Sequence, residues 1–68
     1  MIQTMTINDC AAYLRARGMS ISNESLANGL ERGAFSFGTA FRSDKGGRVA
    51  YIYKRLLDEW IKERETED

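Results

Sequence analysis

The apolar residues near the N-terminus recur at helical spacing. Ile7 is followed at i+3, i+4 and i+7 by apolar side chains that would share one helix face, namely Cys10, Ala11 and Leu14. Thr6 is placed to cap this helix by accepting a hydrogen bond from the Asp9 amide. Gly18 suits the left-handed position that follows many helices. We therefore expect a helix over residues 7–17, preceded by a flexible leader over residues 1–5.

The same signals predict a second short helix over residues 23–32. Ser22 is the preferred N-cap, because apolar residues flank it at the spacing of a hydrophobic staple. Gly33 is expected to end this helix, in the same way that Gly18 ends the first helix. Gly29, inside the helix, costs about 1 kcal/mol relative to alanine. It either allows another backbone to approach closely or is simply tolerated.

The period of the pattern changes to two after Gly33, which indicates a strand. Every second position is then aromatic or β-branched, and the positions between carry smaller residues. The aromatic or β-branched positions are Phe35, Phe37, Thr39 and Phe41, and the smaller residues are Ser36, Gly38 and Ala40. Residues 43–47 end in two glycines and form a loop, and the β-branched and aromatic residues 49–53 form the return strand. The two strands make a hairpin with a basic tip, which carries Arg42, Lys45 and Arg48.

Helical spacing returns from Lys54 onward. This helix has a narrow apolar face, made of Leu56, Leu57, Trp60 and Ile61. Residues 65–68, three of which are acidic, have nothing to bury, so we expect them to fray. The order helix-helix-strand-strand-helix predicts an α+β domain over residues 6–64 with the winged helix-turn-helix architecture.

Composition excludes several classes of function. The 68 residues suffice for one domain, and they include one cysteine, Cys10, and no histidine. No Ser/His or Cys/His pair and no phosphate-cradling glycine motif is present, so we expect neither catalysis nor a bound metal or cofactor. No apolar run approaches the length of a membrane span, and the N-terminus does not read as a signal peptide. These features predict a cytoplasmic location.

The formal net charge of zero hides an uneven distribution. Residues 10–57 contain eight basic and three acidic side chains, whereas residues 58–68 contain two basic and six acidic ones. A basic body with an acidic end is compatible with nucleic-acid binding in a way that a uniformly neutral protein is not.

Two groups of side chains are candidates for contact with double-stranded DNA. The second helix would enter the major groove with Ser22, Asn23, Glu24, Ser25, Asn28 and Arg32. The hairpin and the residue after it would contact backbone or minor groove through Arg42, Lys45, Arg48 and Lys54. Structural alternatives exist for both groups. Ser22 can be only a cap, both asparagines can be merely solvated, and basic residues on a hairpin can simply prevent edge-to-edge aggregation.

Four segments resemble, in this order, parts of excisionase-like, MerR-type DNA-binding domains. They are residues 6–14 (TINDCAAYL), 21–26 (ISNESL), 33–40 (GAFSFGTA), and 51–53 (YIY) with Leu57 and Trp60. The resemblance implies a small, non-catalytic protein of a phage or integrated element that binds and bends DNA and directs an integrase towards excision. It assigns residues 22–32 to the recognition helix and 42–48 to the wing. The longer turn at residues 18–20 and the less basic second helix depart from the family's pattern.

Two functions follow as hypotheses. The first is DNA binding, as an excisionase-like recombination directionality factor or a small transcription regulator, with several copies along a site. The second is a protein-interaction module that has this fold, does not bind DNA and uses the acidic end as its binding element. A related alternative is that the acidic end docks on the basic face of a neighbouring copy. Glu24 in the recognition helix and the zero net charge favour the second.

Overall fold

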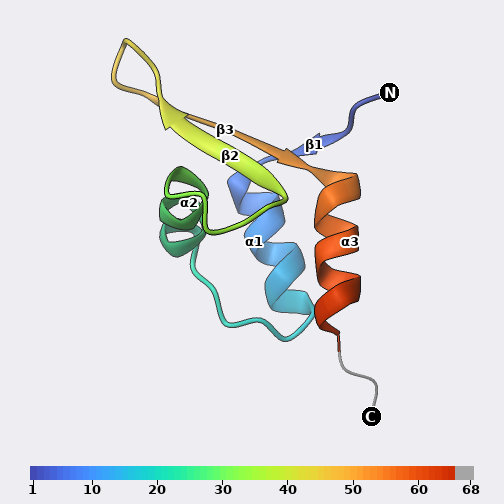
Figure 1. Cartoon of the computed structure of the whole chain (residues 1–68). Helices are drawn as coiled ribbons and strands as arrows, with labels where there is room; N and C mark the ends of the chain where they lie inside the picture. Colours follow the sequence, from blue (N-terminus) through green and yellow to red (C-terminus); the bar gives the residue numbers. More distant parts are fainter. Residues whose placement is uncertain (66–68) are drawn as a thin grey trace.

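The computed structural model describes residues 1–65 (Figure 1). Its first two helices each have a side-chain N-cap. Helix α1 spans Ile7–Ala16 and α2 spans Asn23–Glu31. The Thr6 side chain accepts from the Asp9 amide, and Ser22 Oγ accepts from the Ser25 amide, each at 3.1 Å. A glycine in the left-handed region follows each helix, at φ +97° for Gly18 and +75° for Gly33. The caps and both glycine stops are therefore confirmed, with each helix ending one residue earlier than predicted.

The sheet has three antiparallel strands in the order β1-β3-β2. Strands β2 (Gly38–Arg42) and β3 (Arg48–Tyr53) form the hairpin, in which Ala40 is opposite Ala50. Strand β1 (Thr4–Met5) pairs with the end of β3, so part of the expected flexible leader is ordered. The reason is backbone pairing: the Gln3 carbonyl also accepts from the Lys54 amide at 3.0 Å. Alternation of polar and apolar residues cannot reveal a strand of two residues.

The start of the hairpin differs from the prediction. Phe35 and Phe37 precede β2 instead of belonging to it. Their rings stack with centroids 5.2 Å apart, and both meet the Trp60 indole edge-on. Phe37 is fully buried. Their alternate spacing therefore reflects an aromatic cluster under the sheet, not a strand.

Helix α3 (Lys54–Arg64) completes the fold and lies with α1 and α2 on one side of the sheet (Figure 1). Its buried residues are Leu57 and Ile61, whereas Leu56 is 43% exposed and was wrongly assigned to the apolar face. The core joins all three helices to the sheet, and its buried members are Cys10, Ala11, Leu14, Leu26, Leu30, Phe37, Ala40, Ile52, Leu57 and Ile61.

The predicted acidic end falls mostly on residues 66–68, which lie outside the described residues. Glu65 is described, and its Oε1 lies 2.6 Å from Arg17 Nη1, so this residue is held by an ion pair. Among residues 1–65, no helix is long and apolar enough to cross a membrane. Nor do these residues contain a cluster of three or more metal-ligating side chains.

Candidate nucleic-acid interface

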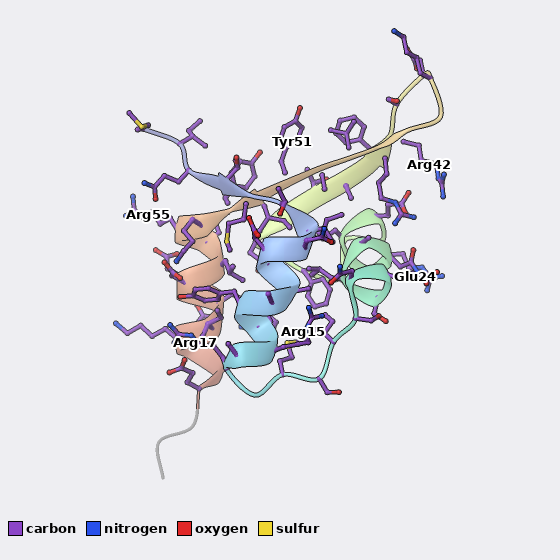
Figure 2. The ribbon with its side chains drawn as sticks, turned by 180° about the vertical axis from the view of Figure 1, so that it is seen from behind. Arg15, Arg17, Glu24, Arg42, Tyr51 and Arg55 are labelled. Atoms are coloured by element: carbon purple, nitrogen blue, oxygen red, sulfur yellow. The ribbon has the colours of Figure 1, made fainter. Side chains whose placement is uncertain are left out.

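Helix α2 and the hairpin meet along one side of the molecule. Figure 2 shows Glu24 of α2 and Arg42 of β2 projecting on that same side. The two elements are joined by Glu31, whose carboxylate lies 3.2 Å from Arg48 Nη2 and 3.7 Å from Arg42 Nε. We call this surface the α2–hairpin face, and its exposed residues include Glu24, Asn28, Arg32, Arg42, Asp44, Lys45 and Arg48.

Three of the predicted recognition residues, Ser22, Asn23 and Ser25, form side-chain hydrogen bonds within the protein. Ser22 Oγ donates to Ser25 Oγ at 2.9 Å while it caps α2. Asn23 Nδ2 donates to Asn8 Oδ1 at 2.5 Å, and Asn23 Oδ1 accepts from Arg15 Nη1 at 3.3 Å. These side chains order the start of α2 and its contact with α1. The prediction that Ser22 caps α2 is therefore confirmed, and its contact with DNA stays a prediction.

The other three predicted residues, two in α2 and one at its C-cap, remain available. Glu24, Asn28 and Arg32 are exposed, and their side chains form no hydrogen bond or ion pair with any other described residue. They lie at spacings of four, which places them on one face of the helix. This face carries an acceptor, an amide and a guanidinium, which together can bond to base edges or phosphates.

Arg15 is a basic residue that the sequence interpretation did not select. Its Nη1 donates to the Ile21 carbonyl at 2.9 Å as well as to Asn23, so it brings a positive charge to the N-terminal end of α2 (Figure 2). The expected pair of helices joined by a short turn places the last turn of the first helix near the start of the second, and that geometry could have identified Arg15 from sequence. A cation here adds to the helix dipole, which already favours an anion.

Lys54 does not belong to the α2–hairpin face. It lies in the first turn of α3, where its Nζ donates to both carboxylate oxygens of Asp58 at 2.6 and 2.7 Å. This hydrogen bond raises the pKa of Lys54 and lowers the pKa of Asp58. The Lys54 ammonium also lies 4.6 Å from the Tyr13 ring centre. Its charge therefore supports the contact between α1 and α3.

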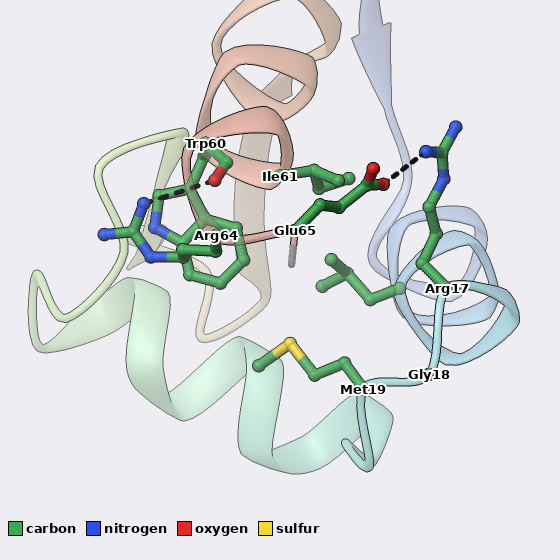
Figure 3. A pocket seen from close by; sticks show the side chains of 8 residues that line it. Arg17, Gly18, Met19, Trp60, Ile61, Arg64 and Glu65 are labelled. Atoms are coloured by element: carbon green, nitrogen blue, oxygen red, sulfur yellow. Dashed lines mark hydrogen bonds and ion pairs between the residues drawn. The ribbon is translucent and has the colours of Figure 1, made fainter. Parts of the chain in front are cut away.

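A hollow of about 510 Å³ opens between the C-terminal ends of α1 and α3 (Figure 3). Leu14, Met19 and Ile61 contribute apolar surface to it. Arg64 stacks over the Trp60 ring at 4.3 Å on one side, and the Arg17–Glu65 ion pair lies on the other. The arrangement can accept an apolar group, and it brings together no nucleophile and general base.

The sheet face opposite the helices carries two exposed aromatic rings. Phe41 and Tyr51 are 47% and 45% exposed, and their ring centres are 6.2 Å apart. Tyr51 points away from the helical layer in Figure 2. An aromatic pair at the surface is suited to contact with another macromolecule.

Comparison with protein-family models, with curated proteins and with solved structures finds no match to this chain. Its function must therefore be inferred from its surfaces. Of these, the α2–hairpin face combines an exposed helix with projecting cations, whereas the hollow and the aromatic pair are mainly apolar.

Proposed function

We propose that this chain is a double-stranded-DNA-binding protein with a winged helix-turn-helix fold. In this proposal α2 enters the major groove and the β2–β3 hairpin acts as the wing. The observation that carries it is the α2–hairpin face, in which an exposed helix lies beside a hairpin with Arg42, Lys45 and Arg48. The major groove is wide enough for an α-helix, and the hairpin cations are suited to the flanking phosphates.

Phosphate contacts are proposed along the whole length of the face. Arg15 and the free amides of α2 would hold one phosphate, and Arg32 another at the opposite end of the helix. The hairpin would add Arg42, Lys45 and Arg48. Such contacts supply sequence-independent affinity and fix the register of the helix in the groove.

Base reading is proposed for Glu24, Asn28 and Arg32. An asparagine can form two hydrogen bonds with adenine, an arginine can do so with guanine, and a carboxylate can accept from cytosine N4. Asn23 is removed from this set because its amide is bonded to Asn8 and Arg15. The expected readout therefore extends along the exposed side of α2, from Glu24 in its first turn to Arg32 at its C-cap.

The biological role that fits best is that of an excisionase-like recombination directionality factor or a small transcription regulator in the cytoplasm. The resemblance of residues 6–14, 21–26 and 33–40 to excisionase-like proteins supports this role and suggests an integrase as partner. A single module of this size buries only about 600–1,000 Å² on DNA, so tight binding would require several copies along the site.

Fluorescence anisotropy with labelled duplex DNA at increasing salt tests the proposal. Wild-type protein should bind at low salt and weaken steeply between about 50 and 200 mM, because neutralised phosphates release counterions. Replacing Arg42, Lys45 and Arg48 by alanine should weaken binding to every sequence and flatten the logarithmic salt slope by roughly 2 units.

The matched control removes three cations on the other side of the molecule, in the variant R17A/K54A/R55A. These cations pair with Glu65, Asp58 and Glu59 on or near α3. The control should bind DNA like the wild type, with folding of both variants checked by circular dichroism. Equal losses in the two triple variants, or no binding by the wild type at low salt, would refute DNA binding through this face.

A protein-interaction module is the second candidate, and the exposed pair of Phe41 and Tyr51 favours it. The double variant F41T/Y51T places threonine, which also favours strands, at both positions while removing the aromatic surface. A bound protein that survives nuclease treatment and is lost in this variant would support the second candidate. Loss of the bound protein on nuclease treatment would support DNA binding instead.

A further inference from the structure

Glu31 is the one acidic side chain in the described residues that contacts two basic residues at the same time. It ends α2 and reaches the hairpin, where Oε2 lies 3.2 Å from Arg48 and Oε1 lies 3.7 Å from Arg42. Its side chain is 25% exposed. The other ion pairs between elements or within α3 each join one acid to one base.

The two arginines that Glu31 contacts are cross-strand partners. Arg42 and Arg48 lie opposite each other in the β2–β3 register, where two like charges would repel. The carboxylate of Glu31 offsets that repulsion and ties the hairpin to α2. Stability of the hairpin therefore favours an acid at this position.

DNA binding, by contrast, disfavours an acidic residue at position 31. A carboxylate in contact with two phosphate-binding arginines repels an approaching phosphate and neutralises part of the charge that attracts it. Each arginine uses one nitrogen towards Glu31 and keeps its other donors, so both can still reach a phosphate. The electrostatic gain from each such contact is smaller than for an unpaired arginine.

We propose that Glu31 acts as an electrostatic brake on sequence-independent DNA binding. It keeps Arg42 and Arg48 partly neutralised, so that phosphate contacts by the wing alone do not hold the protein on any duplex. Base contacts from α2 then account for a larger share of the total affinity, which raises the ratio of specific to non-specific binding. This inference rests on the proposed DNA-binding function.

The test replaces Glu31 by glutamine, which keeps the size and the hydrogen-bond acceptor but removes the charge. Binding to a random-sequence duplex is measured by anisotropy as a function of salt. E31Q should bind roughly three- to tenfold more tightly at low salt, with a logarithmic salt slope steeper by about one unit. Circular dichroism and urea unfolding establish that the variant is folded.

Glu59→Gln is the matched control, because it makes the same change in net charge on the opposite side. Among residues 1–65, Glu59 pairs only with Arg55, within α3. E59Q should leave affinity and slope unchanged, and an equal gain in both variants would overturn the inference by showing that net charge alone matters.

The remaining outcomes separate the two proposals. Unchanged or weaker binding by E31Q, with normal binding by the wild type, overturns the brake and leaves the DNA-binding proposal standing. Weaker binding would mean that Glu31 positions the arginines for phosphate. Absence of binding by both proteins at low salt overturns the proposed function together with this inference.

Discussion

Gly29 occupies a position inside α2 where a side chain would overlap the ring of Phe35. Glycine costs about 1 kcal/mol relative to alanine in a helix interior, so a packing reason is needed for its presence. That reason is the approach of an aromatic side chain, not of a backbone. The ring that rests on Gly29 also stacks on Phe37 and meets Trp60, so the glycine determines how closely α2 approaches the aromatic cluster.

Substitution of Gly29 by alanine should therefore destabilise the protein although alanine favours helix. Overpacking against Phe35 costs about 1–3 kcal/mol, which exceeds the gain in helix propensity. Urea unfolding measures the difference. Asn28→Ala, at the exposed neighbouring position, is the control and should be neutral or slightly stabilising. If G29A were as stable as the wild type, the Phe35 ring would have to move at no cost.

Cys10 provides a second prediction at the residue scale. Its side chain is fully buried, and burial raises the pKa of the thiol from 9.0 to about 11. The folded protein then holds a proton that the unfolded chain releases, so stability should fall as the pH rises from about 9 to about 11. Urea unfolding over this range, compared with Cys10→Ala, measures the contribution, since the variant lacks it.

The reactivity of the same thiol gives an independent check. A buried thiol of raised pKa should resist alkylation in the folded protein and react when urea unfolds it. Rapid alkylation of the native protein at pH 8, at the rate of a free thiol, would contradict the burial of Cys10.

At the scale of elements, Ser22 at the start of α2 has one structural role and one proposed functional role. The side chain caps the helix, and in the proposed complex it lies near phosphate. Ser22→Ala should lower stability by about 1 kcal/mol because the Ser25 amide loses its acceptor. Ser22→Asp should retain the cap and the stability, since aspartate caps as well as serine, but weaken DNA binding through its negative charge.

Urea unfolding and anisotropy on the same two variants separate these effects. Normal DNA affinity in S22D would mean that the N-terminus of α2 does not approach phosphate. Ser22→Thr, which keeps both the hydroxyl and the neutral charge, serves as the control for both measurements.

The elements that could be predicted are those whose signals are local. Thr6 and Ser22 lie three residues before the amides they cap, and Gly18 and Gly33 follow the C-cap residues of the two helices. β1 could not be predicted, because its stability comes from pairing with residues almost fifty positions away. The assignment of Phe35 and Phe37 to a strand failed for a related reason, since tertiary packing of aromatic rings imitated the period of a strand.

At the scale of the whole molecule, the candidate site could be predicted only in part. The sequence shows that Arg42, Lys45 and Arg48 share a hairpin, and the fold brings that hairpin beside α2. It could not show that Glu31 pairs with two of these residues or that Asp58 engages Lys54. Ion pairs between elements depend on how the elements pack, so a count of charges along the chain overstates the positive charge on the α2–hairpin face.

Because the core is small, ligand binding should raise the melting temperature, Tm, by a measurable amount. A domain of this size rarely has a core worth more than about 3–5 kcal/mol, and no disulfide reinforces it. Duplex DNA that binds only the folded state, at about 100 times its Kd, should add about 2.7 kcal/mol. Since 1 kcal/mol shifts Tm by about 4–8 °C in a domain of this size, the Tm should rise on the order of 10–20 °C. Calorimetry at low salt with a duplex of about 12 base pairs, slightly more than one turn of the double helix, measures this shift.

The shift should vanish at high salt and in R42A/K45A/R48A, but persist in R17A/K54A/R55A. The measured Kd and the DNA concentration together give the Tm shift expected when only the folded state binds. A much smaller shift would mean that the unfolded chain also binds DNA. Binding would then depend on charge alone and not on the geometry of the α2–hairpin face.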